Sequence, residues 1–276
     1  MLTDITDTIE LANGVTMPRL GLGTYKSAEG GDAERSVTAA LEFGYRSIDT
    51  ASLYGNEAGI GAAIAASGVP RSELFLTSKM WNDEQGFDTT LSAFERSLAR
   101  LGTSYLDLYL VHWPREQTHD TWRALERLYA EGAVRAIGVC NHLEHHLEAL
   151  LAVADVPPMI DQYEFHPWLQ QPSLRAYCQS HGIVVEAWAP LMKGRVAEVP
   201  ELAAIAAAHD KTPAQVAVRW LLQLDVVTIP KSVHAGRIAE NADVFDFALT
   251  GAEMATIASL DRGYRFGPEP DRGGER

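Results

Sequence analysis

Short apolar runs rich in β-branched residues alternate with helix-like patterns along most of the chain. Helical periodicity predicts helices over residues 32–43, 56–67, 88–101, 120–131 and 172–181, and a glycine follows each of them. Glycine just past a helix end is typical of a left-handed C-terminal cap. Thr212 and Thr250, each followed three residues later by Gln or Glu, predict capping boxes that open two later helices. The pattern therefore indicates a regular succession of β and α segments.

Eight strand-like runs are present, centred near Leu22, Ile48, Leu76, Tyr109, Ile137, Ile160, Val185 and Thr228. Eight βα units in a chain of 276 residues predict a single α/β domain, a (β/α)8 TIM barrel over residues 1–276. A doubly wound open sheet also alternates strands and helices and is the alternative. An Asn13-Gly14 turn between two short β runs predicts a hairpin over about residues 8–18, which we expect to cap the barrel floor. The tail from about residue 263 to 276 is rich in Gly, Pro and charge, which predicts a loop.

The strand-like runs share a feature at their ends. Six of them end in a polar, titratable or flat aromatic residue, namely Asp49, Lys79, His112, Asn141, Gln162 and Trp188. In a barrel the carboxyl ends of all strands build one site, whereas in an open sheet the site is confined to a switch point. The repeated polar endings therefore favour the barrel, with one site at its carboxyl face.

Charge and composition narrow the class of partner. The net charge of −14 argues against nucleic acid or an anionic membrane surface. No apolar run approaches the roughly 18 residues of a membrane span, and the N-terminus lacks a basic, then apolar, signal region. Two cysteines, Cys140 and Cys178, give no disulfide framework, so we expect a cytoplasmic protein. The oligomeric state stays open, and a monomer is compatible with the sequence.

Asp49, Lys79 and Tyr54, which lies five residues after Asp49, form a coherent proton donor. Tyrosine is a poor acid near neutrality because its reference pKa is about 10, and a neighbouring ammonium lowers that pKa. A carboxylate beside the lysine keeps it charged and in place, and His112 can orient the reacting oxygen or offer a second proton route. This set suits carbonyl reduction, for which a cofactor must supply the hydride.

The motifs GYRSIDTASLYGNE, LFLTSKMW, DLYLVHWP, IGVCNH, IDQYEFHP and IPKSVHAGRIAEN, in this order, resemble those of the aldo-keto reductase family. The resemblance runs from about Ile9 to Leu260 and is greatest to bacterial 2,5-diketogluconate reductases and small-aldehyde reductases. It implies reduction of an aldehyde or ketone (a small aldehyde, dicarbonyl or keto-sugar) by NADPH. It further implies that Tyr54 is the general acid, Lys79 lowers its pKa, Asp49 holds Lys79 and His112 orients the carbonyl.

The resemblance also implies NADP(H) bound in an extended form across the strand ends. Asn141 and Gln162 would hold the nicotinamide amide and Trp188 would stack on its ring. Lys231, Ser232 and Arg237 would take the 2′-phosphate. The other implied cofactor contacts are Cys140, Ala189, Leu191, Val233, Glu240 and Asn241. The residues favour the same phosphate site independently, because Lys231, His234 and Arg237 cluster at the start of a predicted helix. The Rossmann fingerprint is absent, and Gly59 and Gly61 lie within a helix pattern, where we expect them to serve packing.

Several residues allow more than one interpretation. Aromatic residues after four strands, which could be core residues, are expected to form an apolar substrate wall: Tyr25, Trp81, Trp113 and Trp168. Two positions depart from the family pattern, since Cys140 replaces the usual Ser and Asp161 the usual Asn. Asn141 followed by Glu144 also fits a helix N-cap. His142 and His146 share a helix face, but no third ligand has a compelling position, so we expect no metal. Two alternative functions remain: a cofactor-binding regulatory subunit with little turnover, and a metal-assisted barrel hydrolase or isomerase.

Overall fold

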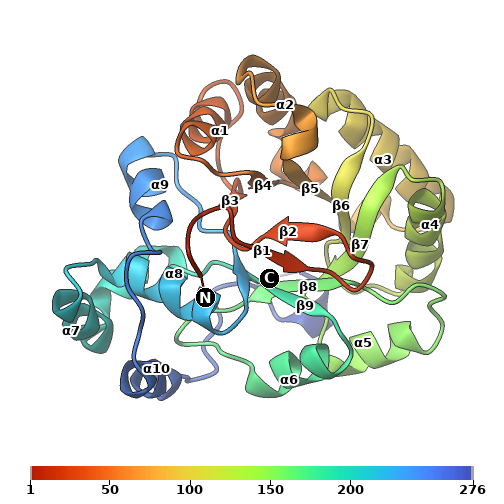
Figure 1. Ribbon diagram of the computed structural model, residues 1–276. Coiled ribbons are helices and arrows are strands. Elements are labelled where there is room, and N and C mark those ends of the chain that lie inside the picture. Colours follow the sequence, from red (N-terminus) through yellow and green to blue (C-terminus); the bar gives the residue numbers. More distant parts are fainter. Residues whose placement is uncertain (1, 275–276) are drawn as a thin grey trace.

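The computed structural model describes residues 2–274 and shows a closed barrel of parallel strands (Figure 1). One sheet contains, in sequence order, β3 (Leu22–Gly23), β4 (Ser47–Asp49), β5 (Phe75–Met80), β6 (Leu106–Val111), β7 (Val134–Cys140), β8 (Ile160–Glu164), β9 (Val184–Trp188) and β10 (Val227–Thr228). Parallel bridges from Leu20 to Thr228 and from Gly23 to Lys231 join the first and last strands. This closure confirms the predicted barrel and excludes the open sheet.

A ring of helices surrounds the strands (Figure 1). The helices are α1 (Asp32–Glu42), α2 (Glu57–Ala66), α3 (Phe87–Leu101), α4 (Thr118–Ala130), α5 (Glu144–Leu151), α6 (Pro172–Ser180), α7 (Pro200–Ala208), α8 (Pro213–Gln223), α9 (Ala235–Ala242) and α10 (Gly251–Ala258). The five glycines that end predicted helices all have positive φ, as a left-handed cap requires. Thr212 and Thr250 form the predicted capping boxes with Gln215 and Glu253.

The predicted N-terminal hairpin is confirmed, with β1 (Thr8–Glu10) paired antiparallel to β2 (Thr16–Pro18). The Asn13 amide in its turn donates to the backbone oxygen of Arg135, the second residue of β7. This contact places the hairpin at the amino-terminal ends of the strands, and it lies across that opening in Figure 1. The hairpin therefore covers the barrel floor and leaves the carboxyl face to the site.

The core lies inside the barrel and between the strands and the helix ring. Every residue of β5 and β6 is buried, which explains why both strands read as nearly continuous apolar runs. A Cβ atom on Gly61 would lie 2.4 Å from the backbone oxygen of Leu101, so Gly61 lets α2 approach the end of α3. At Gly59 the nearest atom would be the flexible carboxylate of Glu34. The interpretation of Gly61 as a packing residue is confirmed, whereas Gly59 meets only a flexible side chain.

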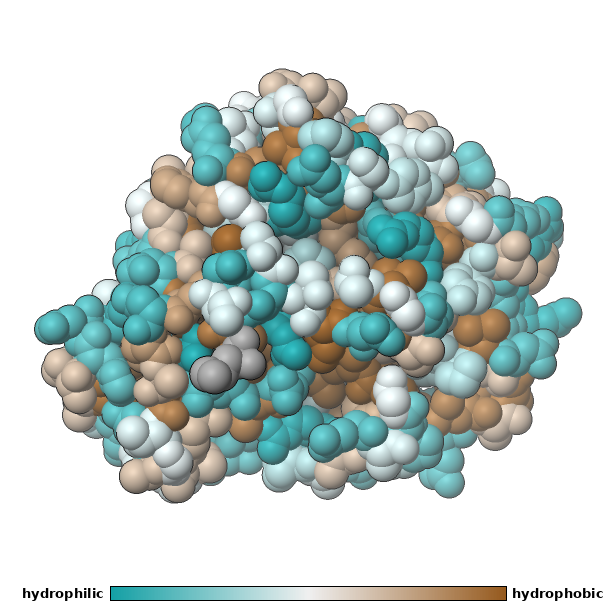
Figure 2. Space-filling model, viewed as in Figure 1, coloured by the Kyte–Doolittle hydropathy of each residue, from teal (hydrophilic) through white to brown (hydrophobic). Residues whose placement is uncertain are grey.

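The outer surface is mixed in character, with hydrophilic residues spread over the face shown in Figure 2. None of the helices in the described part of the chain is both long and apolar enough to traverse a bilayer.

Candidate active site

The side chains of the predicted proton donor meet at the carboxyl ends of neighbouring strands. Asp49 ends β4, Lys79 is the penultimate residue of β5, and Tyr54 ends a short 3-10 turn, η1 (Ser52–Tyr54). The Lys79 ammonium donates to Asp49 Oδ1 at 2.6 Å and to the backbone oxygen of Thr50 at 2.8 Å. The Tyr54 hydroxyl lies 3.5 Å from Lys79 Nζ. Asp49, Lys79 and Tyr54 thus form one connected group.

Burial and charge set the protonation of this group. Burial alone would lower the pKa of Lys79, but the Asp49 carboxylate and Tyr54 outweigh it, so that pKa lies above its usual value. Burial raises the pKa of Tyr54, and the Lys79 charge offsets that rise only in part. The predicted lowering by Lys79 is therefore correct for the contribution of the lysine but not for the net pKa. Tyr54 carries its proton at neutral pH.

His112 follows β6, and its ring lies beside Tyr54. Its ring centroid lies 5.8 Å from that of Tyr54 and 5.0 Å from that of Trp81, both in edge-on arrangements. Burial, followed by repulsion from the Lys79 charge, holds the pKa of His112 well below its usual value. A neutral imidazole can donate one hydrogen bond to a substrate oxygen without adding charge to the site. Tyr25 packs against Tyr54 with ring centroids 5.0 Å apart.

Asn141 and Trp188 tie three strand ends together. The Asn141 amide nitrogen donates to the backbone oxygen of His112 at 3.0 Å, and its oxygen accepts from Trp188 Nε1 at 2.9 Å. Asn141 has φ of 59° and Ala189, after β9, has φ of 52°, both in the left-handed region. Such backbone is uncommon for residues other than glycine and clusters at functional sites. Asn141 does not cap α5, because the N-cap residue is Leu143.

The Gln162 side chain is committed to two buried carboxylates. Its amide nitrogen donates to Asp49 Oδ2 and to Glu186 Oε2, each at 2.8 Å. Its oxygen lies 3.9 Å from the Cys140 thiol, which is the donor of that weak contact. Only the amide oxygen of Gln162 is therefore left for a ligand. Glu186 was missed in the sequence, although a carboxylate inside the apolar run IVVEAW was a usable signal.

Asp161 is a buried acid of β8 whose surroundings favour its neutral form. It is fully buried on β8 and its Oδ1 accepts a long bond of 3.4 Å from the backbone N–H of His142. Burial raises the pKa of Asp161 well above its ordinary value, which favours the neutral carboxyl. A neutral Asp161 resembles the Asn that the family usually has at this position. Burial likewise raises the pKa of the Cys140 thiol.

The predicted phosphate-binding residues follow β10 and open α9. Lys231 and Arg237 are exposed, whereas Ser232 is buried and its hydroxyl accepts from the backbone N–H of His234 at 3.1 Å. Val233 lies between them and is partly buried, like Leu191 after β9. Burial lowers the pKa of Lys231, the negative charge of Asp32 opposes that fall, and the charge of Lys26 adds to it. Lys26 was missed in the sequence and adds a third cation to this end of the site.

Two predicted adenine contacts also hold the helix in place. Glu240 accepts a hydrogen bond of 2.6 Å from the Thr212 hydroxyl, which joins α9 to the start of α8. Asn241 is buried at the carboxyl end of α9. Their contact with adenine stays a prediction.

The four predicted wall aromatics divide into two pairs. Tyr25 and Trp81 contact the rings of Tyr54 and His112 and stay partly open to solvent. Trp113 is buried beneath the tail, because a Cβ atom on Gly274 would lie 2.8 Å from its ring. Trp168 is buried, and the guanidinium groups of Arg195 and Arg262 lie 4.9 and 4.0 Å from its ring centroid. Their role as a substrate wall stays a prediction.

The C-terminal tail crosses the strand ends. The backbone N–H groups of Phe266 and Gly267 donate to the Glu164 carboxylate at 2.7 and 3.0 Å. Further along, Asn82 donates to the backbone oxygen of Gly273 at 2.7 Å. The tail is mostly irregular, as predicted, but it contains one 3-10 turn, η5 (Pro270–Arg272). It therefore lines the site from β8 to the loop after β5.

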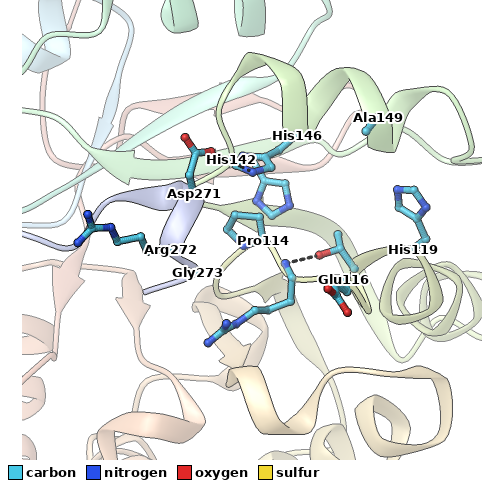
Figure 3. Close-up of a pocket in the computed structure, with 11 residues that line it drawn as sticks. Pro114, Glu116, His119, His142, His146, Ala149, Asp271, Arg272 and Gly273 are labelled. Carbon is cyan, nitrogen blue, oxygen red and sulfur yellow. Dashed lines mark hydrogen bonds and ion pairs between the residues drawn. The ribbon is translucent and has the colours of Figure 1, made fainter. Parts of the chain in front are cut away.

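A pocket of about 590 Å³ lies beside the tail, between the loop after β6 and the start of α5 (Figure 3). His142, His146 and Asp271 line it together, and the nitrogens of His145 and His146 lie 3.0 and 3.4 Å from Asp271 Oδ1. One ligand atom each from His145, His146 and Asp271 lie close enough together to hold a metal ion. The sequence indicated His142 and His146 as the histidine pair, whereas the fold brings together His145, His146 and Asp271.

The protonation of His146 does not fit a metal ligand. Its Nδ1 accepts a hydrogen bond of 3.1 Å from the backbone N–H of Leu143. The neutral ring then carries its hydrogen on Nε2, which faces Asp271. A metal bound at that Nε2 would require the opposite tautomer and the loss of the Leu143 bond. The cluster is a hydrogen-bonded contact that holds the tail to α5.

Comparisons with known proteins agree with this geometry. The model of the family described as "Aldo/keto reductase family" matches residues 19–262. The glyoxal reductase of Bacillus subtilis is 55% identical over 98% of this chain and 99% of its own length. A crystal structure of an aldo-keto reductase from a deep-sea metagenome superimposes with a TM-score of 0.94, at 46% identity, covering 95% of this chain and 98% of that one. The aldo-keto reductase of Bombyx mori, solved in complex with NADP, has a TM-score of 0.89 at 35% identity, covering 96% and 95%.

Proposed function

This chain belongs to the aldo/keto reductase family, and on that premise we propose that it transfers a hydride from NADPH to an aldehyde or ketone carbon, with Tyr54 as the general acid. The observation that carries the proposal is the buried Asp49–Lys79–Tyr54 group beside a neutral His112. The family and the glyoxal reductase homologue make the chain an oxidoreductase of carbonyl compounds.

The residues present fit a nicotinamide dinucleotide. Trp188 is a partly exposed ring held in plane by its bond to Asn141, as a stacking surface requires. At the other end, Lys26, Lys231 and Arg237 gather positive charge on a chain of net charge −14. Charge-assisted bonds from such side chains favour a 2′-phosphate, and hence NADPH over NADH. Bound there, the cofactor would supply the hydride.

The side chains supply the proton and orient the oxygen. As negative charge develops on the carbonyl oxygen, Tyr54 donates its hydroxyl proton to it. The phenolate left behind is stabilised by the Lys79 ammonium 3.5 Å away, which Asp49 keeps charged. Because His112 is neutral, its ring N–H can donate to the same oxygen and align the carbonyl. Aromatic rings around the group, Tyr25 and Trp81, limit access of water.

For the substrate we propose small aldehydes, dicarbonyls and keto-sugars. The glyoxal reductase homologue, at 55% identity, supports a dicarbonyl most directly. We propose a cytoplasmic location, supported by two buried cysteines that are both free thiols.

A screen of purified protein tests this function. NADPH oxidation is followed by absorbance with glyoxal, a simple aldehyde, a keto-sugar and no substrate. Turnover that depends on both NADPH and a carbonyl compound supports the reductase. NADPH binding without turnover on any carbonyl would favour the regulatory-subunit alternative.

A further inference from the structure

Glu186 is a carboxylate in the centre of the barrel that the proposed reaction leaves without a role. It lies on β9 in register with Gln162 on β8 and is fully buried. Its Oε2 accepts from the Gln162 amide at 2.8 Å, while Oε1 has no hydrogen-bond partner within residues 2–274. A buried acid with one unpaired oxygen is costly to keep, so its position calls for a reason.

Glu186 is the end of a chain of polar contacts that begins at the proton donor. Tyr54 lies 3.5 Å from Lys79, Lys79 is 2.6 Å from Asp49, and Asp49 is 2.8 Å from Gln162. Gln162 then donates to Glu186 at 2.8 Å. The contacts cross from β4 to β9 through the buried interior of the barrel.

The Gln162 amide is fixed by this arrangement. Its nitrogen carries two hydrogens, and the Asp49 and Glu186 carboxylates accept one each. A flipped amide would place its oxygen against the Asp49 carboxylate, and in the observed orientation Glu186 accepts the second hydrogen of the Gln162 amide. The hydrogen bond from Gln162 to Asp49 holds the Asp49 carboxylate, and Asp49 in turn positions Lys79.

We propose that Glu186 is a positioning residue that tunes the acidity of Tyr54 through Gln162, Asp49 and Lys79. The inference rests on the proposed function and assigns a further residue to its proton-transfer step. Glu186 is hydrogen-bonded to Gln162 and not to Tyr54, so it acts through its neighbours and its charge.

The protonation of Glu186 gives this role a pH dependence. Burial, followed by the negative charge of Asp49, raises the pKa of Glu186 to about 8, although the Gln162 bond and Lys79 oppose the rise. The titratable groups facing it are Asp49 on β4, Lys79 on β5 and Cys140 on β7. Glu186 is therefore mostly neutral at pH 7 and becomes charged as the pH passes 8.

The sign of the effect follows from charge. An ionised Glu186 adds a second carboxylate near Lys79, which disfavours a phenolate on Tyr54 and makes Tyr54 a weaker acid. The rate of carbonyl reduction should then fall as Glu186 ionises. Charges in the protein interior are partly screened from one another. We therefore expect the single-turnover rate of the wild-type protein to fall about 3- to 10-fold between about pH 7 and pH 9.5.

Glu186→Gln tests the inference, because glutamine has the shape of the neutral acid and can still accept from Gln162. The single-turnover rate of NADPH oxidation with glyoxal is measured from about pH 6 to pH 9.5, together with the dissociation constant of NADPH. The variant should match the wild-type rate near pH 6.5 and lose the alkaline fall, staying constant to within about 2-fold. Asp161→Asn is the matched control, since it also replaces a buried acid of the sheet by its amide but leaves the chain to Tyr54 intact. It should keep the alkaline fall.

An alkaline fall of equal size and midpoint in Glu186→Gln and the wild type would overturn the inference. So would a variant that differs only in its dissociation constant for NADPH and not in its pH profile. Both outcomes can be observed only if the wild-type protein reduces glyoxal or another carbonyl compound. A wild-type protein without such turnover would instead contradict the proposed function, so the two failures are distinguishable.

Discussion

The ammonium nitrogen of Lys79 lies 2.6 Å from a carboxylate oxygen of Asp49, and the two side chains are only 0% and 3% exposed. A buried ion pair is costly to desolvate, and removing one partner leaves the other as an uncompensated charge. Stability should therefore depend on whether the two charges are removed singly or together, whereas activity should be lost in either case.

Single neutralisation of this pair should destabilise the protein more than double neutralisation. We expect Asp49→Asn or Lys79→Met alone to lower the free energy of unfolding by about 3–5 kcal/mol. The double variant should recover most of that loss, since no buried charge is left unpaired. Urea unfolding at pH 7 measures the three values, and strictly additive losses would contradict the coupling. Carbonyl reduction should stay low in all three variants, because none keeps the Lys79 ammonium with its counter-ion.

Arg237 should determine the preference between the two nicotinamide cofactors. The side chain is exposed in the first turn of α9, near Lys231. We expect Arg237→Ala to raise the dissociation constant of NADPH about 10- to 100-fold, because one or two charge-assisted bonds to the phosphate are lost. Binding of NADH should stay nearly unchanged. Fluorescence titration with both cofactors measures this. Equal weakening of NADPH and NADH would place the 2′-phosphate elsewhere.

His142 should make the protein sensitive to acid. Its Nδ1 donates to the Cys140 carbonyl oxygen at 2.9 Å, and burial lowers the pKa of His142 to about 3. The folded-state pKa is below the unfolded value of about 6.5, so the neutral ring stabilises the fold above that value. This stabilisation is lost as the pH falls from about 6.5 toward 3, by up to about 1.4 kcal/mol per pH unit.

His142→Asn removes the titration and keeps an amide that can donate to Cys140. The free energy of unfolding of this variant should fall less steeply between about pH 6.5 and pH 3.5 than that of the wild type. His119→Asn, at an exposed histidine of α4, is the control and should follow the wild-type slope. Parallel slopes for the wild type and His142→Asn would show that His142 is not the acid-sensitive group.

The barrel and the cluster of Asp49, Lys79 and Tyr54 could be predicted because both leave local marks in the chain. Glycine caps, capping boxes and apolar runs are properties of adjacent residues, and the polar strand endings meet wherever parallel strands close. What was missed depends on residues distant in sequence. Asp271 reaches His146 only because the tail crosses the strand ends, and Lys26 reaches Lys231 only because the barrel closes.

The protonation of the site was also beyond the sequence. The net rise in the pKa of Tyr54 depends on how deeply its hydroxyl is withdrawn from water, and no pattern of residue types reports that depth. The orientation of Gln162 also depends on Glu186. The sequence shows that an acidic residue lies inside an apolar run, but it does not show that Gln162 is its partner. Local patterns thus located the site, and packing determined its electrostatics.

The most direct test of the proposed function is the Tyr54→Phe variant assayed with NADPH and glyoxal. Phenylalanine keeps the ring that packs against Tyr25 and His112 and removes only the hydroxyl. We predict that turnover falls by about 10²- to 10⁴-fold, the usual contribution of a general acid, while the dissociation constant of NADPH stays within about 3-fold of the wild-type value. A variant that binds NADPH and reduces glyoxal at the wild-type rate would contradict the assignment of Tyr54 as the proton donor.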